Sequence, residues 1–141
     1  MHDHLQKTAN LVMDVLKHSH GSGADTDHLN LDTWEWPQGV AMYGMMKVVQ
    51  RTKDQKTLDF VISWYDRHLQ KGLPARNINT TAPMLGLALL YETTMDDRYL
   101  PLIKNWAAWI MDEMPRTQEG GLQHLTTHSE NPEQLWDDTL Y

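Results

Sequence analysis

The sequence predicts an all-α protein built from helical hairpins. Apolar residues recur every three to four positions along most of the chain, and no segment alternates convincingly with a period of two. When the sequence is aligned with itself at an offset of 42 residues, identical or similar residues coincide. Examples are the pairs Leu58 and Leu100, Val61 and Ile103, Trp64 and Trp106, and Thr52 and Thr94. Each repeat unit joins a strongly apolar helix, a short polar turn and an amphipathic helix. This pattern predicts two concentric layers, as in α/α toroids.

Two helices are expected in the inner layer because they are apolar around most of their circumference. The first is "GVAMYGMMKVVQ" (Gly39–Gln50), and the second is "APMLGLALLYETT" (Ala82–Thr94). A helix with apolar side chains on every face is typical of a position buried on all sides.

Three one-sided helices are also expected, and the two that follow the inner helices are expected outside that layer. The first, near the N-terminus, carries a stripe that includes Val12. The second and third cover Lys56–Leu69 and Asp97–Met114, each with one apolar stripe and one charged face. Pro101 is expected in the first turn of the last helix, where its missing N–H costs little.

Composition limits the class of protein. A length of 141 residues predicts a single domain, 1–141, and a net charge of −7 without a Lys/Arg block argues against a nucleic-acid partner. The chain has no cysteine, its start does not resemble a secretory signal, and no apolar run approaches the about 18 residues of a membrane span. A cytoplasmic protein without a membrane partner is the expectation.

The repeat predicts that three polar junctions lie at one end of the inner layer. "WEWPQG" (Trp34–Gly39) precedes the first inner helix, and "NINTTAP" (Asn77–Pro83) precedes the second. A longer loop (Pro115–Gln134) leads to "LWDDTLY" (Leu135–Tyr141), which is expected to begin a third. Helix N-termini carry free N–H groups and the positive end of the dipole, which favour an anionic ligand.

The adjacent carboxylates Asp137 and Asp138 allow two interpretations. Aspartate is a preferred helix cap, and the pair could serve only that purpose. Alternatively, the wall of Trp136 and a like-charged neighbour could hold one carboxyl protonated near neutrality for proton transfer.

The other junction residues are similarly ambiguous. Trp34 and Trp36 fit either the core or a sugar platform. Thr80 or Thr81 could be the cap before the second inner helix, whereas the nearby amides, Asn77 and Asn79, exceed what a cap needs. Among the eight histidines, His124 is the one placed in the site. Five others near the N-terminus show no metal-binding spacing and are expected at the surface, namely His2, His4, His18, His20 and His28.

An ordered set of motifs resembles a known family. The segments "WEWPQGV", "NINTTAP", "MPRT", "GGLQH" and "QLWDDTLY" occur at intervals similar to those of glycoside hydrolase family 105, the unsaturated rhamnogalacturonyl hydrolases. The resemblance runs from Trp34 to the last residue. It implies an (α/α)6 barrel, a closed ring of six helical hairpins, in agreement with the repeat.

The resemblance also implies a substrate and a reaction. Enzymes of this family remove a 4,5-unsaturated galacturonyl residue from pectic rhamnogalacturonan oligosaccharides. A carboxylic acid protonates C4, water adds at C5, and the resulting hemiketal opens and releases the sugar. This chemistry differs from attack at the anomeric carbon and requires neither metal nor cofactor.

By the same resemblance, Asp138 matches the proton donor, and Asp137 is the neighbour that could raise its pKa. Four further residues match positions around the sugar, namely Trp36, Asn79, His124 and Trp136. Related unsaturated glucuronyl hydrolases use a second aspartate near "NINTTAP". Because this segment lacks an acid, the rhamnogalacturonyl interpretation is favoured.

The chain departs from the family pattern because it is too short. A ring of six hairpins at this repeat size needs roughly 350 residues. The chain is therefore expected to be the N-terminal part of a barrel, an arc of about five to six helices that associates with itself or lacks a C-terminal half. The alternative from another class is a non-catalytic helical-repeat scaffold that binds a peptide or protein partner.

Overall fold

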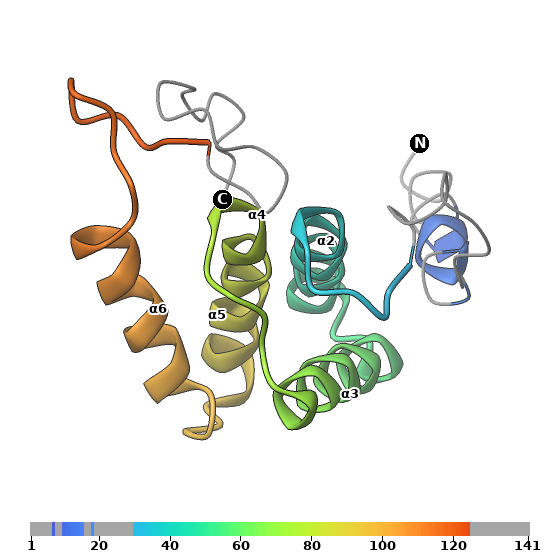
Figure 1. Ribbon diagram of the computed structural model, residues 1–141. Coiled ribbons are helices and arrows are strands. Elements are labelled where there is room, and N and C mark those ends of the chain that lie inside the picture. The colour runs from blue at the N-terminus through green and yellow to red at the C-terminus, as the bar shows by residue number, and fades with distance from the viewer. Residues whose placement is uncertain (1–6, 8–9, 16–17, 19–29, 125–141) are drawn as a thin grey trace.

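The computed structural model describes residues 7, 10–15, 18 and 30–124. The described part is helical, in agreement with the predicted class, and contains one isolated antiparallel bridge between Arg116 and Leu122. Its helices (Figure 1) are α2 (Trp36–Thr52), α3 (Gln55–Lys71), α4 (Ile78–Thr81), α5 (Pro83–Thr94) and α6 (Leu100–Asp112). None of the helices described here is both long and apolar enough to cross a membrane.

The 42-residue repeat is confirmed at the turns that end the inner helices. Lys53 follows α2 and Met95 follows α5, and both adopt the left-handed conformation, with φ of 59° and 54°. The preceding threonine bonds back in each case: the Thr52 hydroxyl donates to the Val48 carbonyl at 2.9 Å, and that of Thr94 to Leu90 at 2.8 Å. The turns after the two inner helices therefore have the same backbone conformation and the same threonine hydrogen bond.

The inner helices α2 and α5 lie side by side and run in the same direction (Figure 1). Gly39 near the start of α2 abuts Ala82 at the start of α5, and Gly86 further along α5 abuts Met42 further along α2. The expectation that α2 is buried on all sides is wrong, because Val40 is 48% exposed. One face of α2 contacts α3 and α5, whereas its opposite face is not covered by another described inner helix.

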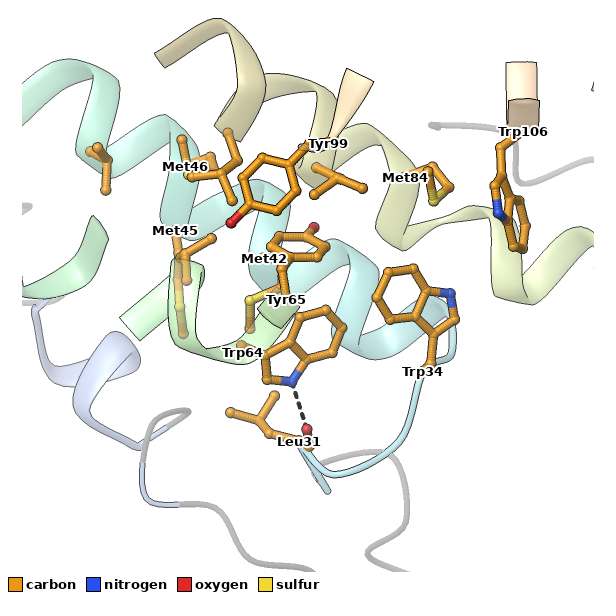
Figure 2. Close-up of a cluster of buried hydrophobic side chains, with 14 residues drawn as sticks. Leu31, Trp34, Met42, Met45, Met46, Trp64, Tyr65, Met84, Tyr99 and Trp106 are labelled. Carbon is orange, nitrogen blue, oxygen red and sulfur yellow. Dashed lines mark hydrogen bonds between the residues drawn. The ribbon is translucent and has the colours of Figure 1, made fainter. Parts of the chain in front are cut away.

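An aromatic cluster joins α3 to the segment before α2 (Figure 2). The Trp34 and Trp64 rings stack with centroids 5.3 Å apart and planes 12° from parallel, and Tyr65 meets both rings edge-on. The Trp64 indole N–H donates to the Leu31 carbonyl at 2.6 Å. Buried aromatic side chains remove large apolar areas from water, and the indole N–H of Trp64 has a hydrogen-bond acceptor. The cluster therefore anchors the chain that leads into α2.

His68 is a buried titratable group in this cluster. It is 5% exposed, lies 4.3 Å from the Trp64 ring centroid, and places Nε2 3.4 Å from the Leu31 carbonyl oxygen. Burial lowers the pKa of His68 from its ordinary 6.5, and the neighbouring cations Arg67 and Lys71 act in the same direction. The Leu31 carbonyl and, more weakly, Asp32 oppose the shift.

We expect the free energy of unfolding to fall as the pH is lowered from 6.5 through the folded-state pKa of His68. The unfolded chain takes up the proton first, so stability is complete above the unfolded pKa and is lost below it. Urea unfolding at about pH 7.5 and about pH 5.5 measures the effect, and His68→Gln should flatten the pH dependence. If the free energy of unfolding of the variant falls equally between these pH values, the loss of stability arises from other titratable groups.

Candidate functional site

The starts of the two inner helices are in backbone contact. A Cβ atom on Gly39 would lie 2.6 Å from both the carbonyl carbon of Ala82 and the nitrogen of Pro83. The Trp34 indole N–H also donates to the Thr80 carbonyl at 2.8 Å, which ties the first polar junction to the second. Two of the three predicted junctions therefore lie at one end of the inner layer.

The two tryptophans of the first junction have different environments. Trp34 is 5% exposed and belongs to the aromatic cluster, so the core interpretation holds for it. Trp36 is the first residue of α2 and is 41% exposed. Of the two indoles, only that of Trp36 offers its surface to a ligand.

The second junction forms a short helix, α4. Asn77 is its N-cap: the side-chain oxygen accepts from the backbone N–H of Asn79 at 2.8 Å and of Thr80 at 3.1 Å. The Thr80 hydroxyl accepts from the Asn77 N–H at 2.9 Å and completes a capping box. The interpretation of Thr80 or Thr81 as the cap is wrong, because both lie buried within α4 and Pro83 starts a separate helix.

Asn79 lies half-buried in α4, three residues before the contact with Gly39. Its backbone N–H is satisfied by Asn77. Within the part of the chain that the structure describes, no hydrogen bond to its side-chain amide is present. The amide of Asn79 is therefore available to a ligand, whereas that of Asn77 is used in capping.

Replacing the cap gives a direct check of this division of roles. Asn77→Ala should lower the free energy of unfolding by about 1 kcal/mol, since it removes the acceptor for two N–H groups at the start of α4. Asn77→Asp keeps the acceptor and should retain most of the stability. Chemical unfolding monitored by circular dichroism measures both variants; unchanged stability in the alanine variant would contradict the capping role.

The third junction is described as far as His124. After α6 the chain folds into a tight turn, in which Thr117 N–H donates to the Gly121 carbonyl at 2.7 Å and Gly120 has a φ of 86°. His124 is half-buried, and its buried Nδ1 finds no partner among the described residues. Trp136, Asp137 and Asp138 lie outside the described residues.

Arg76 was not singled out by the sequence analysis. Its guanidinium lies 5.4 Å from the Trp106 ring centroid and 6.0 Å from that of Trp109, and it donates to the side chain of Asn105. It also lines a cavity of about 190 Å³ with Asn77, beside the end of α6 and the turn that follows. The only available signal was its position directly before "NINTTAP".

The groups at this end of the inner layer suit a polar ligand. No group of three or more His, Asp or Glu side chains able to hold a metal occurs within the described ranges. What gathers at this end are helix N-termini, an exposed indole and a side-chain amide, and Gln123, which precedes His124 in the sequence, lines a cavity with Asn77. Donors and an aromatic face in this combination match the hydroxyl groups and ring of a sugar.

Hairpins that alternate between an inner and an outer layer define the α/α-toroid class. Residues 8–141 match the sequence profile of Glycosyl Hydrolase Family 88, and the chain belongs to that family. It is 37% identical over 109 residues to the unsaturated rhamnogalacturonyl hydrolase YesR of Bacillus subtilis (strain 168).

Two solved structures, described as possible members of the GH105 family, are also similar. The protein from Salmonella enterica serovar Paratyphi A has a TM-score of 0.86 and 36% identity, and that from Klebsiella pneumoniae has 0.84 and 35%; each match covers 98% of this chain. The resemblance to family 105 and the toroid class are thereby confirmed.

The relatives are longer than this chain. The matched region comprises 76% of this chain and 32% of YesR, and each solved match covers 39% of the other protein. The chain thus corresponds to an arc of the toroid.

Proposed function

We propose that this chain contributes to a glycosidase that removes the 4,5-unsaturated galacturonyl residue from rhamnogalacturonan oligosaccharides. Three findings support the proposal: membership of Glycosyl Hydrolase Family 88, similarity to a protein named unsaturated rhamnogalacturonyl hydrolase, and the polar end of the inner layer. The observation that carries it is the contact of Gly39 with Ala82 and Pro83, which gathers Trp36 and Asn79 at that end.

In the proposed reaction, Asp138 is the acid. Its carboxyl proton is transferred to C4 of the C4=C5 double bond, and a water molecule adds to C5. The carboxylate takes a proton from that water, so Asp138 ends in its starting state. The hemiketal then opens, the bond to the leaving sugar breaks, and one water has been consumed.

The other residues would bind and orient the sugar. The exposed indole of Trp36 provides an apolar face for the ring, and Asn79 and His124 provide hydrogen-bonding groups. Trp136 and Asp137 adjoin the acid in the sequence and complete the proposed set. The N-termini of the inner helices favour the uronate carboxylate, because their N–H groups and dipoles attract an anion.

The proposal can be tested with a chimera in which this chain replaces the matching part of the Salmonella protein. Incubation with a lyase-generated unsaturated disaccharide should abolish the ultraviolet absorbance of the enol ether. Persistent absorbance with a folded chimera and a panel of substrates would contradict the proposal. Peptide binding by that same inactive protein would support the scaffold instead.

Trp36→Ala in the chimera should raise KM roughly tenfold and change kcat less, because a stacking surface binds the ground state and the transition state alike. Trp36→Phe retains an aromatic face and should recover most of the loss. Steady-state kinetics distinguishes the outcomes. If KM stays unchanged in the alanine variant, Trp36 does not contact the sugar.

A further inference from the structure

A cavity of about 190 Å³ lies between the second junction and the end of the outer helix α6. Arg76 and Asn77 line it from the junction, Trp109 and Glu113 from the end of α6, and Gln123 from the turn that follows. Figure 1 shows that α6 ends at the same end of the molecule as α4. The cavity therefore lies beside the starts of the inner helices, towards the outer layer. We call it the Arg76 cavity.

The two charged groups of the Arg76 cavity, Arg76 and Glu113, have no ionic partner. Neither forms an ion pair with the other or with any group in the described part of the chain. The Arg76 guanidinium is held instead by uncharged groups, namely the Asn105 side chain and the Trp106 and Trp109 rings. A guanidinium presents planar N–H donors that match both oxygens of a carboxylate. Arg76 is thus positioned to bind a carboxylate that no described residue supplies.

Gln123 adds a side-chain amide without a protein partner. The residue is 9% exposed, and within the ranges that the structure describes no hydrogen bond to this amide is present. A buried amide that stays unsatisfied costs free energy, so its N–H and C=O groups require a partner inside the cavity. Hydroxyl groups both donate and accept, and they can therefore satisfy Gln123 and the Glu113 carboxylate. The buried ring of Trp109 contributes an apolar surface beside these groups.

The size of the Arg76 cavity limits the ligand to a single ring. Pockets for drug-sized molecules have about 300–1,000 Å³, whereas this one has about 190 Å³. A single ring that carries one carboxylate and several hydroxyl groups is a uronic acid residue. Rhamnogalacturonan contains such residues, because galacturonyl and rhamnosyl residues alternate along its chain.

We infer that the Arg76 cavity is a subsite for a saturated galacturonyl residue of the leaving oligosaccharide, the second sugar beyond the cleaved bond. Arg76 binds the carboxylate, and Glu113 and Gln123 bind hydroxyl groups. The first leaving sugar is a rhamnosyl residue, so the next carboxylate along the chain belongs to the second. The inference rests on the proposed function, which supplies the substrate, and it extends that function to a preference for longer oligosaccharides.

Calorimetry with a saturated trisaccharide, a galacturonyl residue between two rhamnosyl residues, measures this subsite without turnover. The trisaccharide should bind the chimera, and Arg76→Gln should weaken its affinity at least about tenfold, because a charge-assisted pair is lost. Glutamine keeps part of the aliphatic stem that packs on the indoles, so the variant should retain the fold, as near-ultraviolet circular dichroism would show. Arg51→Gln, in the last turn of α2 at the opposite end, is the matched control and should leave the affinity intact.

A modified ligand tests whether Arg76 contacts the carboxylate. Methyl esterification of the galacturonyl carboxyl group should weaken binding to the unsubstituted chimera by a similar factor. The same esterification should have little further effect on Arg76→Gln, because each change removes one partner of the same pair.

Steady-state kinetics separates the subsite from the proposed chemistry. KM of the chimera should be lower for an unsaturated tetrasaccharide than for the unsaturated disaccharide, and Arg76→Gln should bring the tetrasaccharide KM up to that of the disaccharide. A chimera that turns over neither substrate, yet binds the trisaccharide through Arg76, would contradict the proposed function and still support the subsite.

Three results would overturn the inference. One is the absence of trisaccharide binding. Another is equal binding of the free acid and the methyl ester. The third is an equal rise of both KM values in Arg76→Gln, because that result would limit Arg76 to holding the second junction against α6.

Discussion

Asp138→Asn in the chimera is expected to lower kcat by about a thousandfold while leaving the fold and the affinity for the unsaturated disaccharide largely intact. Asparagine has nearly the shape of aspartic acid but has no carboxyl proton to give to C4. General acid catalysis contributes about 10²- to 10⁴-fold, and in the proposed reaction the same group also deprotonates the attacking water. Loss of the enol-ether absorbance measures turnover, and calorimetry with the inactive variant measures binding.

Asp137→Asn is the matched control for this experiment. It makes the same carboxyl-to-amide change at the adjacent residue, so a general effect of losing a carboxyl group in this motif would appear in both variants. We expect Asp137→Asn to retain considerably more activity than Asp138→Asn. A near wild-type rate in Asp138→Asn would remove that residue from the donor role, and the reverse ranking would give the role to Asp137.

Gly39→Ala is expected to lower the free energy of unfolding of this chain by about 2 kcal/mol. Within a helix this substitution usually stabilises, because alanine is the better helix former. At Gly39 the added methyl carbon would lie 2.6 Å from backbone atoms of Ala82 and Pro83, which cannot move aside as a flexible side chain can. Accommodating the methyl requires α2 and α5 to separate.

Gly44→Ala provides the contrast in the same helix. Its added carbon meets no described atom within 4 Å, so the chain alone should gain up to about 1 kcal/mol from helix propensity. Urea unfolding should therefore show a lower free energy of unfolding for Gly39→Ala and a higher one for Gly44→Ala, each relative to the unsubstituted chain. Equal stability of Gly39→Ala and the unsubstituted chain would contradict the close contact of the inner helices.

Much of the fold could be predicted because each repeat unit has its own apolar periodicity and its own polar turn. The 42-residue shift anticipated the equivalent turns after α2 and α5, whose threonines form the same backbone bonds. The shift did not reveal the short helix α4, which precedes the second inner helix, α5. Nor did it reveal that Asn77 caps α4, because the interpretation of Thr80 or Thr81 placed the cap directly before the second inner helix.

The candidate site was predicted less completely, because burial depends on distant contacts. Trp34 and Trp36 are two residues apart in one motif, and only the stacking of Trp34 on Trp64 shows which indole enters the core. Arg76 gave no periodic signal, since its partners are aromatic rings on α6. The assignments of Trp136, Asp137 and Asp138 remain predictions from the sequence motif.

The most direct test of the proposed chemistry is to run the reaction of the chimera in heavy water and analyse the released sugar by nuclear magnetic resonance. Proton transfer from the acid to C4, followed by hydration at C5, predicts one solvent deuterium bound to C4 in the product and loss of the double bond. Release of the sugar with its double bond intact, or without deuterium at C4, would show that cleavage follows another route.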